Sequence, residues 1–181
     1  NLPLITEAIR KLTSRLKDFQ KNRNNIAFEE HLLSELSKFN SKYFTSPEYE
    51  RKIRKGEINE GKYGKEKEEE FLLTYNDLVN KYFIKIKQDK NGSFLEKWFL
   101  TPVREEIDFL FKELKNLDNK DIKKVLAIIL SRTVRSCRAT THADLGTLKE
   151  PVTTTYYCKK HGKICKPLFS ILDWWQRYTI D

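Results

Sequence analysis

The three cysteines and two of the three histidines of this chain fall within residues 137–165. Cys158, His161 and Cys165 form a Cys-x2-His-x3-Cys pattern, and Cys137 and His142 precede it. Such close spacing lets a tight turn present several soft ligands to one metal ion, while Cys137 or His142 arrives from an upstream helix end. Three thiolates and one imidazole suit tetrahedral zinc. We therefore expect a structural zinc bound by Cys137, Cys158, His161 and Cys165, with His142 as the alternative fourth ligand.

This cluster has other interpretations. Three cysteines can form one disulfide and one free thiol, or they can be small buried residues in a metal-free polar cluster. An odd number of cysteines without a signal peptide argues against an oxidised, secreted framework. A catalytic zinc is disfavoured because the sequence has no His-Glu-x-x-His helix or comparable general base. Three thiolates also fall short of the four that an iron–sulfur cluster usually takes.

Composition favours a polyanionic partner. The chain carries 35 Lys and Arg against 26 Asp and Glu, a net charge of +9, and cations beside phosphates displace condensed counterions. The longest apolar run, residues 125–130, is too short to span a bilayer, and the first residues lack the features of a secretory signal. We expect a soluble, cytoplasmic protein without membrane contact. The absence of Met indicates a piece of a longer protein, or alternatively a trimmed or tagged chain.

Apolar residues recur at helical spacing over 3–21, 27–43, 71–86, 103–114 and 120–135. We therefore predict a mainly α fold with a helical bundle-like domain over 1–135. A small zinc-braced Cys/His unit is expected over 136–181, ending in a short helix opened by Pro167. The glycine-rich, highly charged residues 48–70 predict a mobile segment, or alternatively a ragged, solvent-exposed helix. Its basic residues either contact phosphates or only solvate the surface: Arg51, Lys52, Arg54, Lys55, Lys62 and Lys65.

Three phrases resemble site-specific DNA methyltransferases of restriction–modification systems. They are residues 131–142 (Ser-Arg-Thr-Val-Arg-Ser-Cys-Arg-Ala-Thr-Thr-His), 145–151 and 156–169, and residues 94–99 (Phe-Leu-Glu-Lys-Trp-Phe) are similar to the same region. In that family a glycine-rich S-adenosylmethionine motif precedes such a stretch, and an Asp/Ser-Pro-Pro-Tyr catalytic motif follows it. The region between them carries elements that recognise the DNA target. The resemblance covers about 94–181 and is strongest over 131–169.

The chain departs from the family pattern at both flanking motifs. It has no Phe-x-Gly-x-Gly loop, and none of its five prolines is paired with another. A flipped base needs the Pro-Pro-aromatic platform for hydrogen bonding and stacking. The resemblance therefore implies a DNA-recognition region, with amino-group methylation of adenine or cytosine catalysed outside this chain. S-adenosylmethionine would bind only in the full-length parent. The implied partners are double-stranded DNA and the catalytic portion of the same parent protein.

Basic and hydroxyl-bearing residues around the cysteine cluster form the predicted DNA-binding surface. Arg132, Arg135 and Arg138 follow one another every three residues at a helix end, and a guanidinium pairs bidentately with guanine or phosphate. Alternatively, these arginines bind helix C-terminal carbonyls or the acids Asp144 and Glu150. The remaining members of the predicted set surround the metal ligands: Thr140, Thr141, Lys159, Lys160, Lys163 and Lys166.

Two further functions fit the same residues. One is a zinc-stabilised structural or protein-interaction module, and the other is an independent RNA-binding domain. Steep salt dependence of duplex affinity favours the DNA-recognition hypothesis, whereas a preference for single strands favours RNA.

Overall fold

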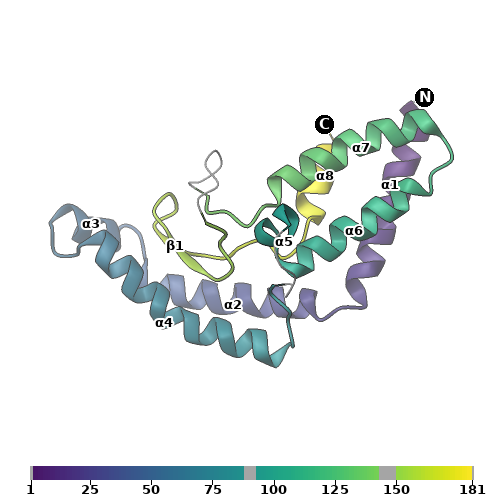
Figure 1. The fold of residues 1–181 in the computed structure, drawn as a ribbon. Helices are drawn as coiled ribbons and strands as arrows, with labels where there is room; N and C mark the ends of the chain where they lie inside the picture. The colour runs from purple at the N-terminus through teal and green to yellow at the C-terminus, as the bar shows by residue number, and fades with distance from the viewer. Residues whose placement is uncertain (1, 88–92, 143–149, 181) are drawn as a thin grey trace. The chain divides into compact units, whose positions relative to one another are not determined.

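The computed structural model describes residues 2–87, 93–142 and 150–180, so Asp144 and most of the 145–151 phrase lie outside the described residues. The described part is mainly α-helical, which confirms the predicted fold class (Figure 1). Its elements are α1 (Leu2–Lys21), α2 (Asn25–Tyr43), α3 (Glu48–Arg54), α4 (Glu60–Lys81), α5 (Phe94–Trp98), α6 (Thr101–Lys115), α7 (Lys120–Ser136), β1 (Tyr156–Cys158), β2 (Lys163–Cys165) and α8 (Leu172–Ile180).

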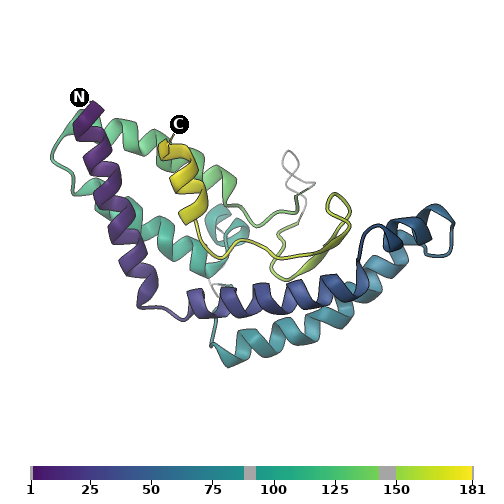
Figure 2. The same ribbon diagram turned by 180° about the vertical axis from the view of Figure 1, so that it is seen from behind.

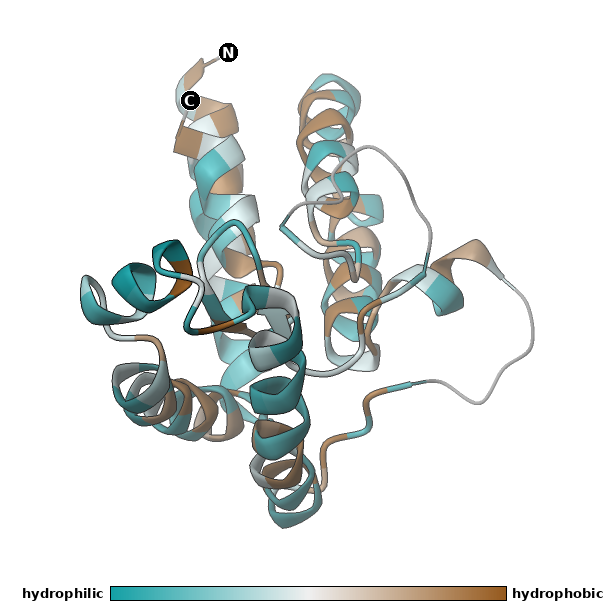
Figure 3. Ribbon diagram, turned by 90° about the vertical axis from the view of Figure 1, so that its left-hand side faces the viewer, coloured by the Kyte–Doolittle hydropathy of each residue, from teal (hydrophilic) through white to brown (hydrophobic). Residues whose placement is uncertain are grey.

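The long helices are amphipathic, as the periodicity predicts. Hydrophobic and hydrophilic residues alternate around them and form no continuous apolar rod (Figure 3). None of the described helices combines the length and the apolar character that crossing a bilayer requires. Helical stability in such elements comes mainly from burying one face against neighbours.

The chain divides into two compact units, each assembled from segments that are distant in sequence. Unit 1 comprises Asn1–Ile26, Lys85–Ala139 and Leu168–Asp181, and unit 2 comprises Ala27–Ile84 and Thr140–Pro167. The sequence predicted a boundary between 135 and 136 instead. The units differ from that division because α8 packs with α1 and α7, whereas the β1–β2 hairpin packs on α4.

Unit 1 is built around α1, α6, α7 and α8. Leu16, Leu126 and Trp175 have no exposed surface in this core, and Leu110 is 1% exposed. The indole Nε1 of Trp175 donates to Thr13 Oγ1 at 2.9 Å, so its polar atom is satisfied while its ring is buried. Each such side chain contributes about 1.5–3 kcal/mol by leaving water.

The helices of unit 1 begin in different ways. Pro102 lies in the first turn of α6, but Thr101 is already helical and Leu100 takes the N-cap position. Asn119 caps α7 by accepting from two backbone N–H groups. The last helix begins at Leu172 and not at Pro167, because Phe169 and Ile171 are buried in the segment that leads to it.

One buried polar network ties three segments of unit 1 together. Glu106 on α6 is 1% exposed and accepts from Gln20 Nε2 on α1 at 3.0 Å and from the Ile171 backbone N–H at 2.8 Å. Gln20 also donates to Ser170 Oγ at 2.7 Å. Burial raises the pKa of Glu106, and these donors oppose that shift. The carboxyl group thus joins α1, α6 and the start of the C-terminal segment.

We expect Glu106→Ala to lower the free energy of unfolding of unit 1 by about 2 kcal/mol, because it leaves two buried donors without an acceptor. All three Trp residues, Trp98, Trp174 and Trp175, belong to unit 1, so urea unfolding followed by Trp fluorescence measures this change. The exposed Glu7→Ala variant on α1 is the matched control and should unfold like the unmodified chain. Equal stability of the two variants would contradict the role of the network.

Unit 2 has α2 and α4 side by side, as both ribbon views show (Figures 1 and 2). Aromatic pairs join the two helices, with ring centroids 6.4 Å apart for Phe28 and Tyr75 and 4.9 Å apart for Phe39 and Phe71. Each aromatic pair stabilises the fold by about 0.5–1.5 kcal/mol in addition to the free energy gained by burying its surface.

The segment 48–70 contains α3 and the first half of α4, in line with the helical alternative for this segment. Its few apolar residues include two tyrosines, which meet in one aromatic cluster of unit 2. Tyr49 is 6% exposed and lies against Phe44 and Tyr63, with centroid distances of 5.2 Å and 5.8 Å. Composition alone missed this cluster because the tyrosines are spaced too far apart to form a helical stripe.

Candidate metal centre

The β1–β2 hairpin places the cysteines on one face. Tyr156 pairs with Cys165 and Cys158 pairs with Lys163 in an antiparallel register. Because side chains alternate along a strand, Cys158 and Cys165 share a face, and Tyr157 and Ile164 share the other. The spacing of the Cys-x2-His-x3-Cys pattern therefore brings both thiols together through strand pairing.

A tight turn between the strands carries His161 back toward the thiols. The backbone N–H of His161 donates to the carbonyl of Cys158 at 3.1 Å. Gly162 follows with φ +58°, a left-handed conformation that glycine adopts without steric cost. His161 Nδ1 consequently lies 3.4 Å from Cys165 Sγ.

Four ligand-type side chains converge at this hairpin: His142, Cys158, His161 and Cys165 have one potential ligand atom each, all within 4.8 Å of one another. His142 Nδ1 lies 3.7 Å from Cys158 Sγ, and the two imidazole centroids are 4.5 Å apart. Zinc bonds of about 2.0–2.3 Å separate tetrahedral ligand atoms by roughly 3.3–3.8 Å. Two thiols and two imidazoles at these distances fit a tetrahedral zinc after a small contraction.

The surroundings of the group favour neutral ligands until a cation binds. Burial lowers the pKa of His142, and the neighbouring His161 and Lys160 lower it further, so its imidazole is neutral near pH 7. Burial raises the pKa of Cys165, with Cys158 adding to the effect. A bound divalent cation reverses this preference because it compensates the thiolate charge. The hydroxyl of Tyr156 lies 3.0 Å from His142 Nδ1, so it can hydrogen-bond this nitrogen only while no metal is bound there.

Cys137, which the sequence analysis placed in the ligand set, lies in unit 1 at the C-terminal end of α7. It is 1% exposed, and burial raises the pKa of its thiol, with Glu106 and Asp173 adding to the effect. Its environment is that of a small buried core residue. The group that the structure brings together therefore contains His142, the alternative ligand, in the place of Cys137.

The opposite face of the hairpin is fixed to α4 through Tyr157. Its backbone N–H donates to Glu68 at 2.8 Å and its hydroxyl donates to Glu60 at 2.9 Å. Tyr49 Oη lies 3.0 Å from Tyr157 Oη. Sequence reasoning missed these residues, since Glu60 and Glu68 read as solvated charges in the highly charged segment. Together they hold the β1–β2 hairpin against α3 and α4.

The predicted DNA-binding residues are divided between the units. Lys159, Lys160 and Lys163 are exposed on the hairpin of unit 2, and Thr140 and Thr141 are half-buried there. Lys166 forms an ion pair with Glu29 of α2 and is only 17% exposed. That lysine therefore serves the packing of unit 2.

The three arginines of the predicted set belong to unit 1. The Arg132 guanidinium lies over the Tyr178 ring, 4.7 Å from its centroid. Arg138 Nε donates to the carbonyl of Arg135 at 3.0 Å, which matches the alternative of a helix C-terminal contact. Arg135 is exposed.

The chain was compared with known proteins. It is 44% identical over 176 residues to Type II methyltransferase M.MjaII of Methanocaldococcus jannaschii. The chain resembles a Type II methyltransferase. This confirms the resemblance to the methyltransferases of restriction–modification systems that the sequence indicated. The similarity covers 94% of the chain. It therefore reaches well into the first 90 residues, for which the sequence analysis gave helical periodicity but no family resemblance.

The chain spans about one third of the length of this relative (33%). No protein-family model and no solved structure matches the chain. The similarity supports a role related to methyl transfer.

Proposed function

We propose that this chain is a DNA-recognition region of a site-specific, S-adenosylmethionine-dependent DNA methyltransferase. The similarity to Type II methyltransferase M.MjaII supports the methyltransferase part of this proposal. The observation that carries the recognition part is the position of Lys159 and Lys160, both exposed in the turn that contains one of the four grouped ligand residues.

The region contributes recognition and not chemistry in this proposal. Its sequence has neither a glycine-rich cofactor loop nor a Pro-Pro-Tyr platform. Methylation of the amino group of adenine or cytosine would occur in the rest of the parent protein, which would also bind S-adenosylmethionine.

A structural zinc bound by His142, Cys158, His161 and Cys165 would brace the turn. Fixing the backbone before binding reduces the conformational entropy that is lost when the lysines meet phosphates. The net charge of +9 supports a duplex as the partner, since each phosphate contact releases counterions. The other predicted contacts, Thr140, Thr141, Lys163 and the arginines of unit 1, belong to the same proposal.

Fluorescence anisotropy with a labelled 20-base-pair duplex, recorded over a range of salt concentrations, tests this function. The double variant Lys159→Ala/Lys160→Ala should weaken duplex binding about tenfold or more at low salt. It should also reduce the slope of log affinity against log salt by about 2, because two phosphate contacts are lost.

The matched control is Lys11→Ala/Lys17→Ala, which removes the same charge from exposed positions of α1 in unit 1. This control variant should change the duplex affinity and its salt dependence much less than Lys159→Ala/Lys160→Ala does. Duplex affinity that does not respond to salt, or equal losses in both double variants, would refute DNA recognition by the turn. Tighter binding of single-stranded RNA than of the duplex would support the RNA-binding alternative.

A further inference from the structure

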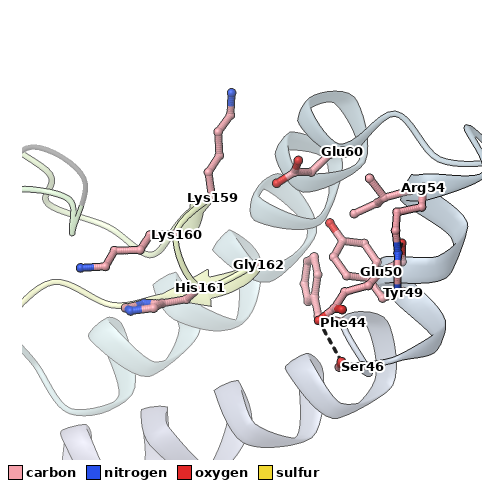
Figure 4. A pocket seen from close by; sticks show the side chains of 11 residues that line it. Phe44, Ser46, Tyr49, Glu50, Arg54, Glu60, Lys159, Lys160, His161 and Gly162 are labelled. Atoms are coloured by element: carbon pink, nitrogen blue, oxygen red, sulfur yellow. Dashed lines mark hydrogen bonds between the residues drawn. The ribbon is translucent and has the colours of Figure 1, made fainter.

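A cavity of about 580 Å³ lies in unit 2 beside the candidate metal group (Figure 4). Its walls come from the residues after α2, from α3, from the first residue of α4 and from the β1–β2 turn. The cavity lies within the roughly 300–1,000 Å³ range of small-molecule sites, which is much more room than one phosphate group needs. The fold thus brings the charged segment and the Cys/His turn to one site.

The apolar wall of this cavity is preformed. Phe44 and Tyr49 are 8% and 6% exposed, and their rings meet edge to face at 5.2 Å. Phe44 stacks on Tyr157 at 5.7 Å, and the hydroxyls of Tyr49 and Tyr157 are 3.0 Å apart. Since these contacts hold the wall without a ligand, a planar group can rest against it at little ordering cost.

Cations line the cavity without carboxylate partners. Among the described residues, no ion pair involves Arg54, Lys159 or Lys160, whereas Lys52 pairs with Glu48 at 3.3 Å. Arg54 Nε lies 3.4 Å from the Glu50 carbonyl, which leaves its two terminal nitrogens for another acceptor. In Figure 4 both lysine side chains extend away from Arg54: Lys159 rises from the turn and Lys160 runs to the left.

Two acids face the same space and restrict the kind of ligand. Glu50 accepts from Ser46 Oγ at 2.9 Å, and Glu60 accepts from the Tyr157 hydroxyl at 2.9 Å, so each has a second oxygen for another donor. A polyphosphate would be repelled by these carboxylates. A ligand with one phosphate and neighbouring N–H or O–H donors satisfies both kinds of residue.

We propose that this cavity binds a single nucleotide unit, with its phosphate on Arg54 and its base against Phe44 and Tyr49, and that the exposed Lys159 side chain turns toward the same phosphate on binding. Amino or hydroxyl groups of the base and sugar donate to Glu50 and Glu60. The source of this unit rests on the proposed DNA-recognition function: it would be one nucleotide of a DNA strand. A free mononucleotide carries the same chemistry.

Titration of the zinc-loaded 181-residue chain with dCMP and dAMP, followed by amide chemical shifts, tests the cavity. We expect shifts confined to residues 44–60 and 159–162. Arg54→Ala and Lys159→Ala should each weaken mononucleotide binding about tenfold or more, because each removes a charge-assisted hydrogen bond. Lys81→Ala is the matched control: it removes one charge from an exposed position of α4 in the same unit, outside the cavity lining, and should stay within about twofold.

Titrations with inorganic phosphate and with a DNA duplex show whether the cavity recognises phosphate alone, a free mononucleotide or a nucleotide within DNA. Glu50→Gln should tighten binding of inorganic phosphate and weaken that of dCMP. Absence of shifts at millimolar mononucleotide, or equal affinities of Arg54→Ala and Lys81→Ala, would overturn the cavity proposal even if the duplex still binds in a salt-dependent way. Mononucleotide binding without duplex binding would support the cavity's ligand chemistry and refute the proposed DNA function.

Discussion

Removing the proposed zinc should unfold the hairpin of unit 2, and this is the largest effect expected for the chain. Structural zinc sites contribute about 10–16 kcal/mol of apparent binding free energy at neutral pH, and most of that is folding free energy. Addition of a strong chelator should therefore abolish the protection of amides in residues 150–167 against hydrogen exchange. The Trp fluorescence of unit 1 should change much less, since its core contains none of the four grouped residues.

Single substitutions distinguish the two possible ligand sets. His142→Ala should reduce zinc affinity by about 100-fold or more, because one of four ligands is lost. Cys137→Ala should keep one equivalent of zinc, since this thiol is buried in unit 1. Elemental analysis after gel filtration gives both stoichiometries. Loss of zinc from Cys137→Ala with retention in His142→Ala would return the ligand set to that expected from the sequence. Less than about half an equivalent in the unmodified chain would refute the metal centre.

Much of unit 1 and the existence of a metal-type cluster can be predicted from the sequence. Leu16, Leu110 and Leu126 fall on apolar stripes with helical periodicity, and all three are buried in the observed helices. Cys158, His161 and Cys165 are close in sequence, so a turn alone brings them together. Their grouping needed no knowledge of the rest of the fold.

The choice between Cys137 and His142 could not be made from spacing. Both residues precede the hairpin in the sequence. The deciding factor is tertiary: Cys137 ends a helix whose buried face belongs to unit 1, whereas Tyr156 of the hairpin contacts His142. Likewise, Tyr49 and Glu60 acquire their roles only when α3 and α4 meet Tyr157.

Gly64 is the position at which a single added side chain should separate the hairpin from α4. A Cβ at this helical position would come within 2.7 Å of Tyr157 Cε1 and closer still to Cγ and Cδ1. The ring cannot turn aside, because Tyr157 is held through its backbone N–H by Glu68 and through its hydroxyl by Glu60. We therefore expect Gly64→Val to destabilise unit 2 by about 3 kcal/mol, from overpacking and from the loss of these hydrogen bonds.

Gly61→Val provides a control in the same helix. The nearest atom to a Cβ at Gly61 is Asn59 Oδ1 at 3.7 Å, an ordinary contact, so the valine should be tolerated. The free energies of opening from hydrogen exchange in α4 and β1 measure both variants. Because the hairpin carries the metal group on its other face, Gly64→Val should also weaken zinc binding, whereas Gly61→Val should not. Equal protection in the two variants would show that the hairpin does not depend on its contact with α4.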